Sequence, residues 1–187
     1  MPALPLIAIS LLTTAQAGGS SSDACASLIP PALNMQLTTA LPDYRLPSSE
    51  DAGAERLKAI TAQGDWPCPF IVLSDFDGDG RLDRAMLLPA RNGDGARLLV
   101  ALNAPDQWLF SLSEDWPMAM NLSELRPLES GLYQRNDAIA QPAAQLDQLQ
   151  SLQADFSSFR AGNTGAEYNL YALVGGHWQK LVMPAEP

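Results

Sequence analysis

Short apolar runs bounded by turn residues recur along the chain from residue 70 onward, and this pattern is typical of β-strands. The runs span residues 70–74, 84–89, 97–102, 108–112, 168–174 and 177–182. Gly175 and Gly176 separate the last two runs and suit a two-residue hairpin turn. Residues 92–95, Asn-Gly-Asp-Gly, mark another hairpin turn. We therefore expect a meander of antiparallel strands.

Helical patterns are fewer, and they lie before and after the meander. Ser48 or Ser49 can cap a helix over about residues 50–63, with acidic residues in its first turn and a glycine after its end. Leucines at steps of three favour a second helix over residues 142–156, with a strand as the alternative. The sequence therefore predicts an α+β, β-rich fold with one or two helices.

The loop between the first two predicted strands carries the most specific chemistry in the sequence. Within residues 75–83, glycines stand at positions 4 and 6, and carboxylates at positions 1, 3, 5 and 9 are Asp75, Asp77, Asp79 and Asp83. These side chains, with the carbonyl of Arg81 at position 7, suit Ca²⁺, which binds six to eight oxygens. Four carboxylates this close repel one another without a cation. The spacing predicts a calcium site, and the alternative is an Asp- and Gly-rich hairpin that binds no metal.

The residues around this loop distinguish it from a helical EF-hand. Position 12 is Met86, where an EF-hand loop has a bidentate Glu, and the flanking runs predict strands. Residues 70–89 resemble the calcium loop of FG-GAP and VCBS-type repeats, in which Asp-x-Asp-Gly-Asp-Gly-x-x-Asp joins two strands. The resemblance implies Ca²⁺ binding in a secreted or cell-surface protein. The chain has one such loop, whereas a propeller requires several blades, and its layout resembles small exported bacterial proteins with a single loop.

The N-terminal residues predict export. Residues 1–17 contain an apolar core followed by Ala15-Gln16-Ala17, which has small residues at the two positions that cleavage requires. A buried N-terminal strand or helix is the alternative, and the apolar core is too short to span a membrane. Residues 18–47 contain several prolines and predict an extended segment ahead of a single globular domain over residues 48–187. We expect a periplasmic or secreted protein.

The cysteine count agrees with export. Cys25 and Cys68 both follow the predicted cleavage site, and an even count in an exported chain predicts a disulfide. The bond would hold the N-terminal segment beside the first strand and close to the metal loop. A nucleophilic thiol is the weaker alternative, because the one histidine of the chain, His177, is the only imidazole that could serve as its base.

Charge and composition argue against several functions. The formal net charge is −10 and the isoelectric point is near 4.3, whereas nucleic-acid binding requires clustered Lys and Arg. The sequence has no Rossmann or P-loop pattern, and one histidine cannot build a His-rich zinc site. Carboxylates outside the metal loop could serve a glycoside hydrolase, and the candidates are Glu114, Asp115, Glu124 and Glu129.

The sequence favours a non-catalytic calcium-binding module with a protein or glycan partner. Trp108, Trp116 and Trp178 are the candidate contact residues, because aromatic anchors contribute strongly to interfaces, and core packing is the alternative role for these rings. A second hypothesis is a periplasmic inhibitor or immunity protein against a cell-wall-acting enzyme. A third is a hydrolase that uses carboxylates.

Overall fold

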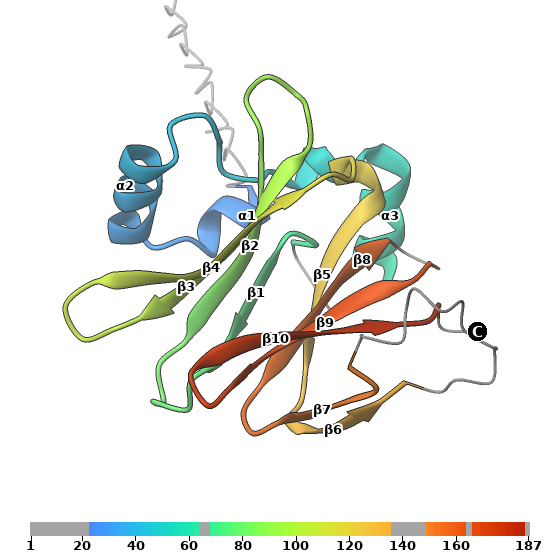
Figure 1. Cartoon of the computed structure of the whole chain (residues 1–187). Coiled ribbons are helices and arrows are strands. Elements are labelled where there is room, and N and C mark those ends of the chain that lie inside the picture. The colour runs from blue at the N-terminus through green and yellow to red at the C-terminus, as the bar shows by residue number, and fades with distance from the viewer. Residues whose placement is uncertain (1–22, 64–67, 136–148, 164–165, 186–187) are drawn as a thin grey trace, which may run out of the picture.

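The computed structural model describes residues 23–63, 68–135, 149–163 and 166–185, and it confirms the α+β, β-rich class. The first sheet is a four-stranded antiparallel meander (Figure 1). Its strands, adjacent in chain order, are β1 (Ile71–Ser74), β2 (Asp83–Pro89), β3 (Ala96–Asn103) and β4 (Trp108–Trp116). Every residue of β2 is buried. Ser74 pairs with Asp83, so the β1–β2 hairpin closes directly around the acidic loop.

The second sheet joins the last strands of the chain to β5. In spatial order its strands are β10 (His177–Met183), β9 (Tyr168–Val174), β8 (Ser158–Asn163) and β5 (Ser123–Leu128). A separate ribbon pairs β6 (Gly131–Gln134) with β7 (Ser151–Ala154), and the short helix η2 (Met120–Leu122) precedes β5. Gly175 and Gly176, with φ values of 57° and 79°, form the predicted turn between β9 and β10.

The two sheets pack against each other around one large core (Figure 1). Phe159 of β8 and Tyr171 of β9 are buried in this core, and their rings stack with centroids 5.1 Å apart. At one edge the sheets are also joined through the backbone, because the Leu125 N–H of β5 donates to the Pro69 carbonyl at 2.7 Å. A second, smaller core lies between the second sheet and the β6–β7 ribbon.

The N-terminal segment is helical where the sequence predicts extended chain. It contains α1 (Ala24–Ser27) and α2 (Pro31–Ala40). Pro31 stands at the start of α2, where its missing N–H and fixed φ are compatible with a helix, so this proline begins the element that it was expected to exclude. Leu33 and Leu37, one turn apart on α2, are buried in the main core. The prediction of an extended segment is therefore wrong for α2.

The predicted disulfide is present between Cys25 of α1 and Cys68, two residues before Phe70. Both cysteines are fully buried in the main core, together with Ile29 and Phe70. The segment from Asp23 onward therefore belongs to the packed body of the domain, and the bond holds it beside the first strand as the sequence predicts.

The predicted helix over residues 50–63 is divided in two. A 3₁₀ turn, η1 (Ser49–Ala52), precedes α3 (Ala54–Gln63). Ser48 caps η1 in a capping box with Asp51, which confirms Ser48 as the capping residue. Gly53 separates the two pieces because its φ of 76° is incompatible with a right-handed helix. The glycine expected to end the helix lies outside the described residues.

The predicted helix over residues 142–156 is wrong where the structure describes it. Residues 151–154 form β7 and pair with β6, and residues 142–148 lie outside the described part of the chain. Leu152 and Ala154 are buried and alternate with exposed neighbours, which is the period of a strand. Both pack into the smaller core against the second sheet, and this contact determines the conformation.

Candidate metal centre

The acidic loop runs from the end of β1 to the start of β2, as predicted. Gly78 and Gly80 have φ values of 78° and 84°, so both occupy the left-handed region that only glycine enters at little cost. Asp75 organises this turn from within, because its carboxylate accepts hydrogen bonds from the N–H groups of Gly78 at 2.7 Å, Asp79 at 3.1 Å and Gly80 at 2.8 Å. The loop is therefore curved inward around its first carboxylate.

Three of the predicted ligands converge in this loop. Asp75, Asp77 and Asp83 each place one carboxylate oxygen so that all three oxygens lie within 4.8 Å of one another. Asp83 is fully buried, and the other two are half-buried. The donor set consists of carboxylate oxygens, which suits a hard cation such as Ca²⁺ rather than a metal that prefers nitrogen or sulfur. The residues present therefore fit a hard metal ion, and Ca²⁺ as its identity stays a prediction.

The electrostatics of the cluster favour a bound cation. Burial raises the pKa of Asp83 to about 6, although the N–H groups of Asn103 and Phe76 each donate to its carboxylate at 2.8 Å. Burial also raises the pKa of Asp77, and the neighbouring carboxylates of Asp79 and Asp75 add to the effect. Both shifts express the cost of holding negative charge here, and a divalent cation would offset that cost.

Asp79 lies outside this group of three. Its side chain forms an ion pair with Arg81, and the Arg81 guanidinium also donates to the carbonyl of Asn103 on β3. Arg81 thus links the loop to β3, and Asp79 pairs with the guanidinium that makes this link. The roles of Asp79 and of the Arg81 carbonyl as ligands stay predictions.

Two phenylalanines that the sequence reasoning missed support the loop. Phe76, between the first two ligands, is fully buried, with its ring centroid 5.5 Å from that of Phe159 and 5.8 Å from that of Trp178. Phe156, from the β7–β8 loop, covers Gly78 so closely that a Cβ there would lie 2.2 Å from its ring. The one signal in the sequence is an aromatic residue at position 2 of a loop composed mainly of Asp and Gly.

The three candidate tryptophans serve mainly the core. Trp108 and Trp116 are only 8% and 5% exposed, as the core-packing alternative expects, so they present little surface to a partner. The indole N–H of Trp116 donates to the Ser123 hydroxyl at 2.9 Å. Trp178 is half-buried, and its indole N–H donates to the Ser111 hydroxyl of β4 at 3.1 Å. Trp178 alone of the three keeps a partly open ring.

Three of the carboxylates considered for hydrolysis have cationic partners. Glu124 is buried and pairs with Arg56 at 3.0 Å and with Arg126 at 3.2 Å. Asp115 pairs with Arg97. Glu114 is approached by the ammonium of Lys180 at 3.7 Å and accepts a hydrogen bond from the hydroxyl of Tyr171. The Glu114 contacts join the two sheets, the exposed Asp115 pair joins β4 to β3, and Glu124 on β5 is joined to α3.

Comparison with models of known protein families, with curated proteins and with solved structures finds no match to this chain. In the described part of the chain, none of the helices has the length and apolar character needed to cross a membrane. The site itself is therefore the basis for the functional conclusion.

Proposed function

We propose that this chain is an exported, calcium-stabilised binding domain that engages a protein or glycan partner and catalyses no reaction. The observation that carries the proposal is the convergence of the Asp75, Asp77 and Asp83 carboxylates at the end of the β1–β2 hairpin. The resemblance of this loop to FG-GAP and VCBS-type repeats supports calcium as the cation, because the same residue spacing serves calcium there.

The role of the ion would be structural. Phe76 fastens the loop to Phe159 of β8 and Trp178 of β10, so the loop connects the two sheets as well as the two strands that it joins. A cation held by the neighbouring carboxylates would reduce their repulsion and stabilise this connection. Extracellular calcium modules bind at about 10⁻⁴ to 10⁻³ M. At such affinities the ion would be bound only where free calcium reaches about 10⁻⁴ to 10⁻³ M.

Export is supported by the disulfide and by the N-terminal pattern. Disulfides such as Cys25–Cys68 persist in the periplasm and outside the cell, and are rare in reducing compartments. Residues 1–17 have the features of a secretory signal. The net charge of −10 agrees with a partner other than nucleic acid.

Calorimetric titration of the chelator-stripped protein with Ca²⁺ tests the metal site. We expect one ion to bind with a dissociation constant of about 10⁻⁴ to 10⁻³ M. Asp77→Asn should weaken binding about tenfold or more, because it removes a charged ligand. Asp94→Asn is the matched control, since Asp94 is an exposed acid in the next hairpin loop. Absence of Ca²⁺ uptake at 10 mM, on the order of ten times the weakest expected constant, would refute the site.

The binding function has its own test. The purified domain is incubated with cell-envelope polysaccharides and with envelope proteins, with Ca²⁺ and with chelator, and retained material is identified. We expect a defined glycan or protein to be retained more strongly with Ca²⁺, and no polysaccharide to be cleaved. Cleavage that is lost in a Glu124→Gln or Glu114→Gln variant that melts at the temperature of the unchanged protein would instead establish a carboxylate-based hydrolase.

A further inference from the structure

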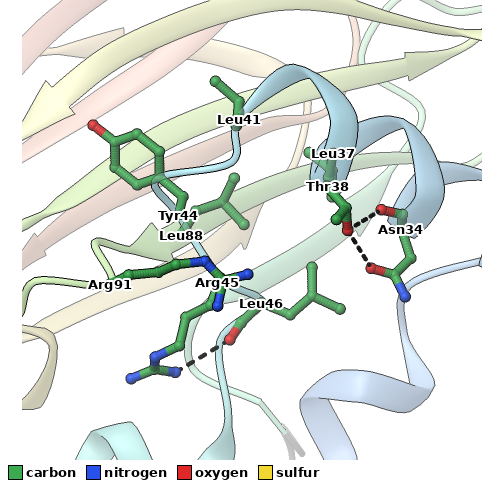
Figure 2. Close-up of a pocket in the computed structure, with 9 residues that line it drawn as sticks. All are labelled: Asn34, Leu37, Thr38, Leu41, Tyr44, Arg45, Leu46, Leu88 and Arg91. Atoms are coloured by element: carbon green, nitrogen blue, oxygen red, sulfur yellow. Dashed lines mark hydrogen bonds between the residues drawn. The ribbon is translucent and has the colours of Figure 1, made fainter.

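A small cavity lies between α2 and the segment that leads from α2 towards η1 (Figure 2). Its volume is about 100 Å³. The inner wall is apolar, because Leu37 of α2 and Leu88 of β2 are 3% and 1% exposed and Leu41 and Leu46 are half-buried. An apolar cavity of about 150 Å³ can hold a benzene ring, so this smaller volume suits a smaller apolar group such as a short branched aliphatic chain.

Two arginines stand at the edge of this cavity, and they differ in what they contact. Arg45 is committed to Asp51, since its guanidinium donates to that carboxylate at 2.8 Å and also to the carbonyl of Leu46 at 3.2 Å. The Arg45 charge is therefore neutralised locally. Asp51 has a pKa below its ordinary value, because its hydrogen bonds with Arg45 and the Ser48 N–H outweigh the opposing effect of burial.

Arg91 has hydrogen-bond donors that the described residues do not use. Its Nε donates to the Pro42 carbonyl at 3.0 Å and its backbone N–H to the Asp43 carbonyl at 2.9 Å, and these bonds hold the exposed side chain among the residues that line the cavity. Among the described residues, its two terminal nitrogens make no hydrogen bond and no carboxylate lies within ion-pair distance. Figure 2 shows this guanidinium near the middle of the residues that line the cavity.

We propose that this cavity binds a carboxylate carried on a short branched aliphatic group. The aliphatic part would contact Leu37 and Leu88, and the carboxylate would accept hydrogen bonds from the terminal nitrogens of Arg91. An arginine fork matches a carboxylate in shape and charge, and an apolar wall selects against inorganic anions. Both a free branched acid and the C-terminal residue of a polypeptide have this chemistry.

The inference is independent of the calcium site. The cavity adjoins the end of β2, whereas Asp83 begins that strand, and the six steps between Asp83 and Pro89 span about 20 Å. Removal of the metal ligands should therefore leave the cavity intact, and removal of Arg91 should leave calcium binding intact. Failure of one proposal does not affect the other.

Titration of ¹⁵N-labelled protein with 3-methylbutanoate, followed by heteronuclear NMR, tests the proposal. We expect saturable shifts of the backbone amides that border the cavity, including those of Leu41 and Arg91. The neutral analogue 3-methylbutan-1-ol and inorganic phosphate should each bind at least tenfold more weakly, since one lacks the charge and the other lacks the apolar group. Comparable shifts with either analogue, or none with 3-methylbutanoate, would overturn the assignment.

Variants make the test specific. Arg91→Gln should weaken binding about tenfold, whereas Lys58→Gln, which removes one exposed positive charge on α3, should leave it unchanged. Thr38→Leu, at an exposed position of α2, fills the cavity and should abolish binding without removing any charge. Equal affinity in Arg91→Gln and in the unchanged protein would contradict the proposal.

A short peptide distinguishes the two sources of the carboxylate. Acetyl-Gly-Gly-Val with a free C-terminus is compared with its C-terminal amide and with 3-methylbutanoate. Tighter binding of the free peptide than of the small acid would assign the cavity to a polypeptide C-terminus, and the reverse order would assign it to a free acid. Equal binding of the free peptide and its amide would overturn the role given to Arg91.

Discussion

Replacement of Phe76 by alanine tests whether the acidic loop depends on the core beneath it. Phe76 is fully buried, and its ring meets Phe159 and Trp178 at centroid distances of 5.5 and 5.8 Å. Loss of a buried Phe side chain costs about 3 to 5 kcal/mol of unfolding free energy, of which each aromatic contact contributes about 0.5 to 1.5 kcal/mol. For a chain of this size, that corresponds to a fall in Tm of about 6 to 20 °C.

The assay is urea unfolding followed by tryptophan emission, with chelator and with Ca²⁺. With chelator present, the unfolding free energy of Phe76→Ala should be lower by the full amount given above. That of Phe76→Leu should fall by less than half as much, because leucine retains most of the buried volume. The control is Leu132→Ala, since Leu132 on β6 is 58% exposed and its loss should cost about 1 kcal/mol or less.

The same variant should also weaken Ca²⁺ binding. Phe76 lies between Asp75 and Asp77 in the chain, so it positions the backbone that presents both carboxylates. Mutation of a residue that holds metal ligands in place typically weakens metal binding about 10- to 100-fold. A Phe76→Ala protein with unfolding free energy within 1 kcal/mol of the unchanged protein would refute the packing argument, and a normal calcium isotherm would refute the positioning argument.

Three further predictions concern the stability of the folded domain. Replacement of both Cys25 and Cys68 by serine should lower the unfolding free energy by about 4 kcal/mol by the chain-entropy estimate, since the bond joins residues 43 positions apart. Calorimetry of the double variant and of the unchanged protein measures this difference. Gly78→Ala should lower the unfolding free energy by about 1 to 2 kcal/mol because of backbone strain at a φ of 78°, and by a further amount because the new Cβ would clash with the Phe156 ring. Adding Phe156→Ala should remove the loss caused by the clash and leave the loss caused by the backbone strain. The pKa of Asp51 in the folded protein is below its ordinary value of 3.8, so the ionised side chain stabilises the fold at pH values above 3.8 and this stabilisation is lost as the pH falls through the folded-state pKa. Asp51→Asn should therefore make the unfolding free energy fall less steeply in acid. An unchanged dependence of the unfolding free energy on pH would contradict this.

The local features of this protein were determined by sequence. The strand–loop–strand unit follows from apolar runs on both sides of Asp75–Asp83, and the β9–β10 hairpin follows from Gly175-Gly176, because turn geometry and strand alternation depend on neighbouring residues. The Cys25–Cys68 pairing also followed from a count, since two cysteines allow one bond. The capping residue Ser48 was recognisable for the same local reason.

Tertiary contacts decided the rest. Residues 151–154 have helical spacing of leucines nearby, yet they form a strand because β6 and the smaller core receive them. Pro31 begins a helix whose Leu33 and Leu37, one turn apart, are buried in the main core; Pro at the first helical position and leucines four apart are local helix signals, but only the folded chain shows that this face is covered. In the acidic loop, the spacing of the residues predicts five ligands. The burial of Asp83 and the ion pair between Asp79 and Arg81, however, depend on the folded chain. Desolvation and side-chain pairing arise only when distant segments meet, and for this reason the group of Asp75, Asp77 and Asp83 became visible only in three dimensions.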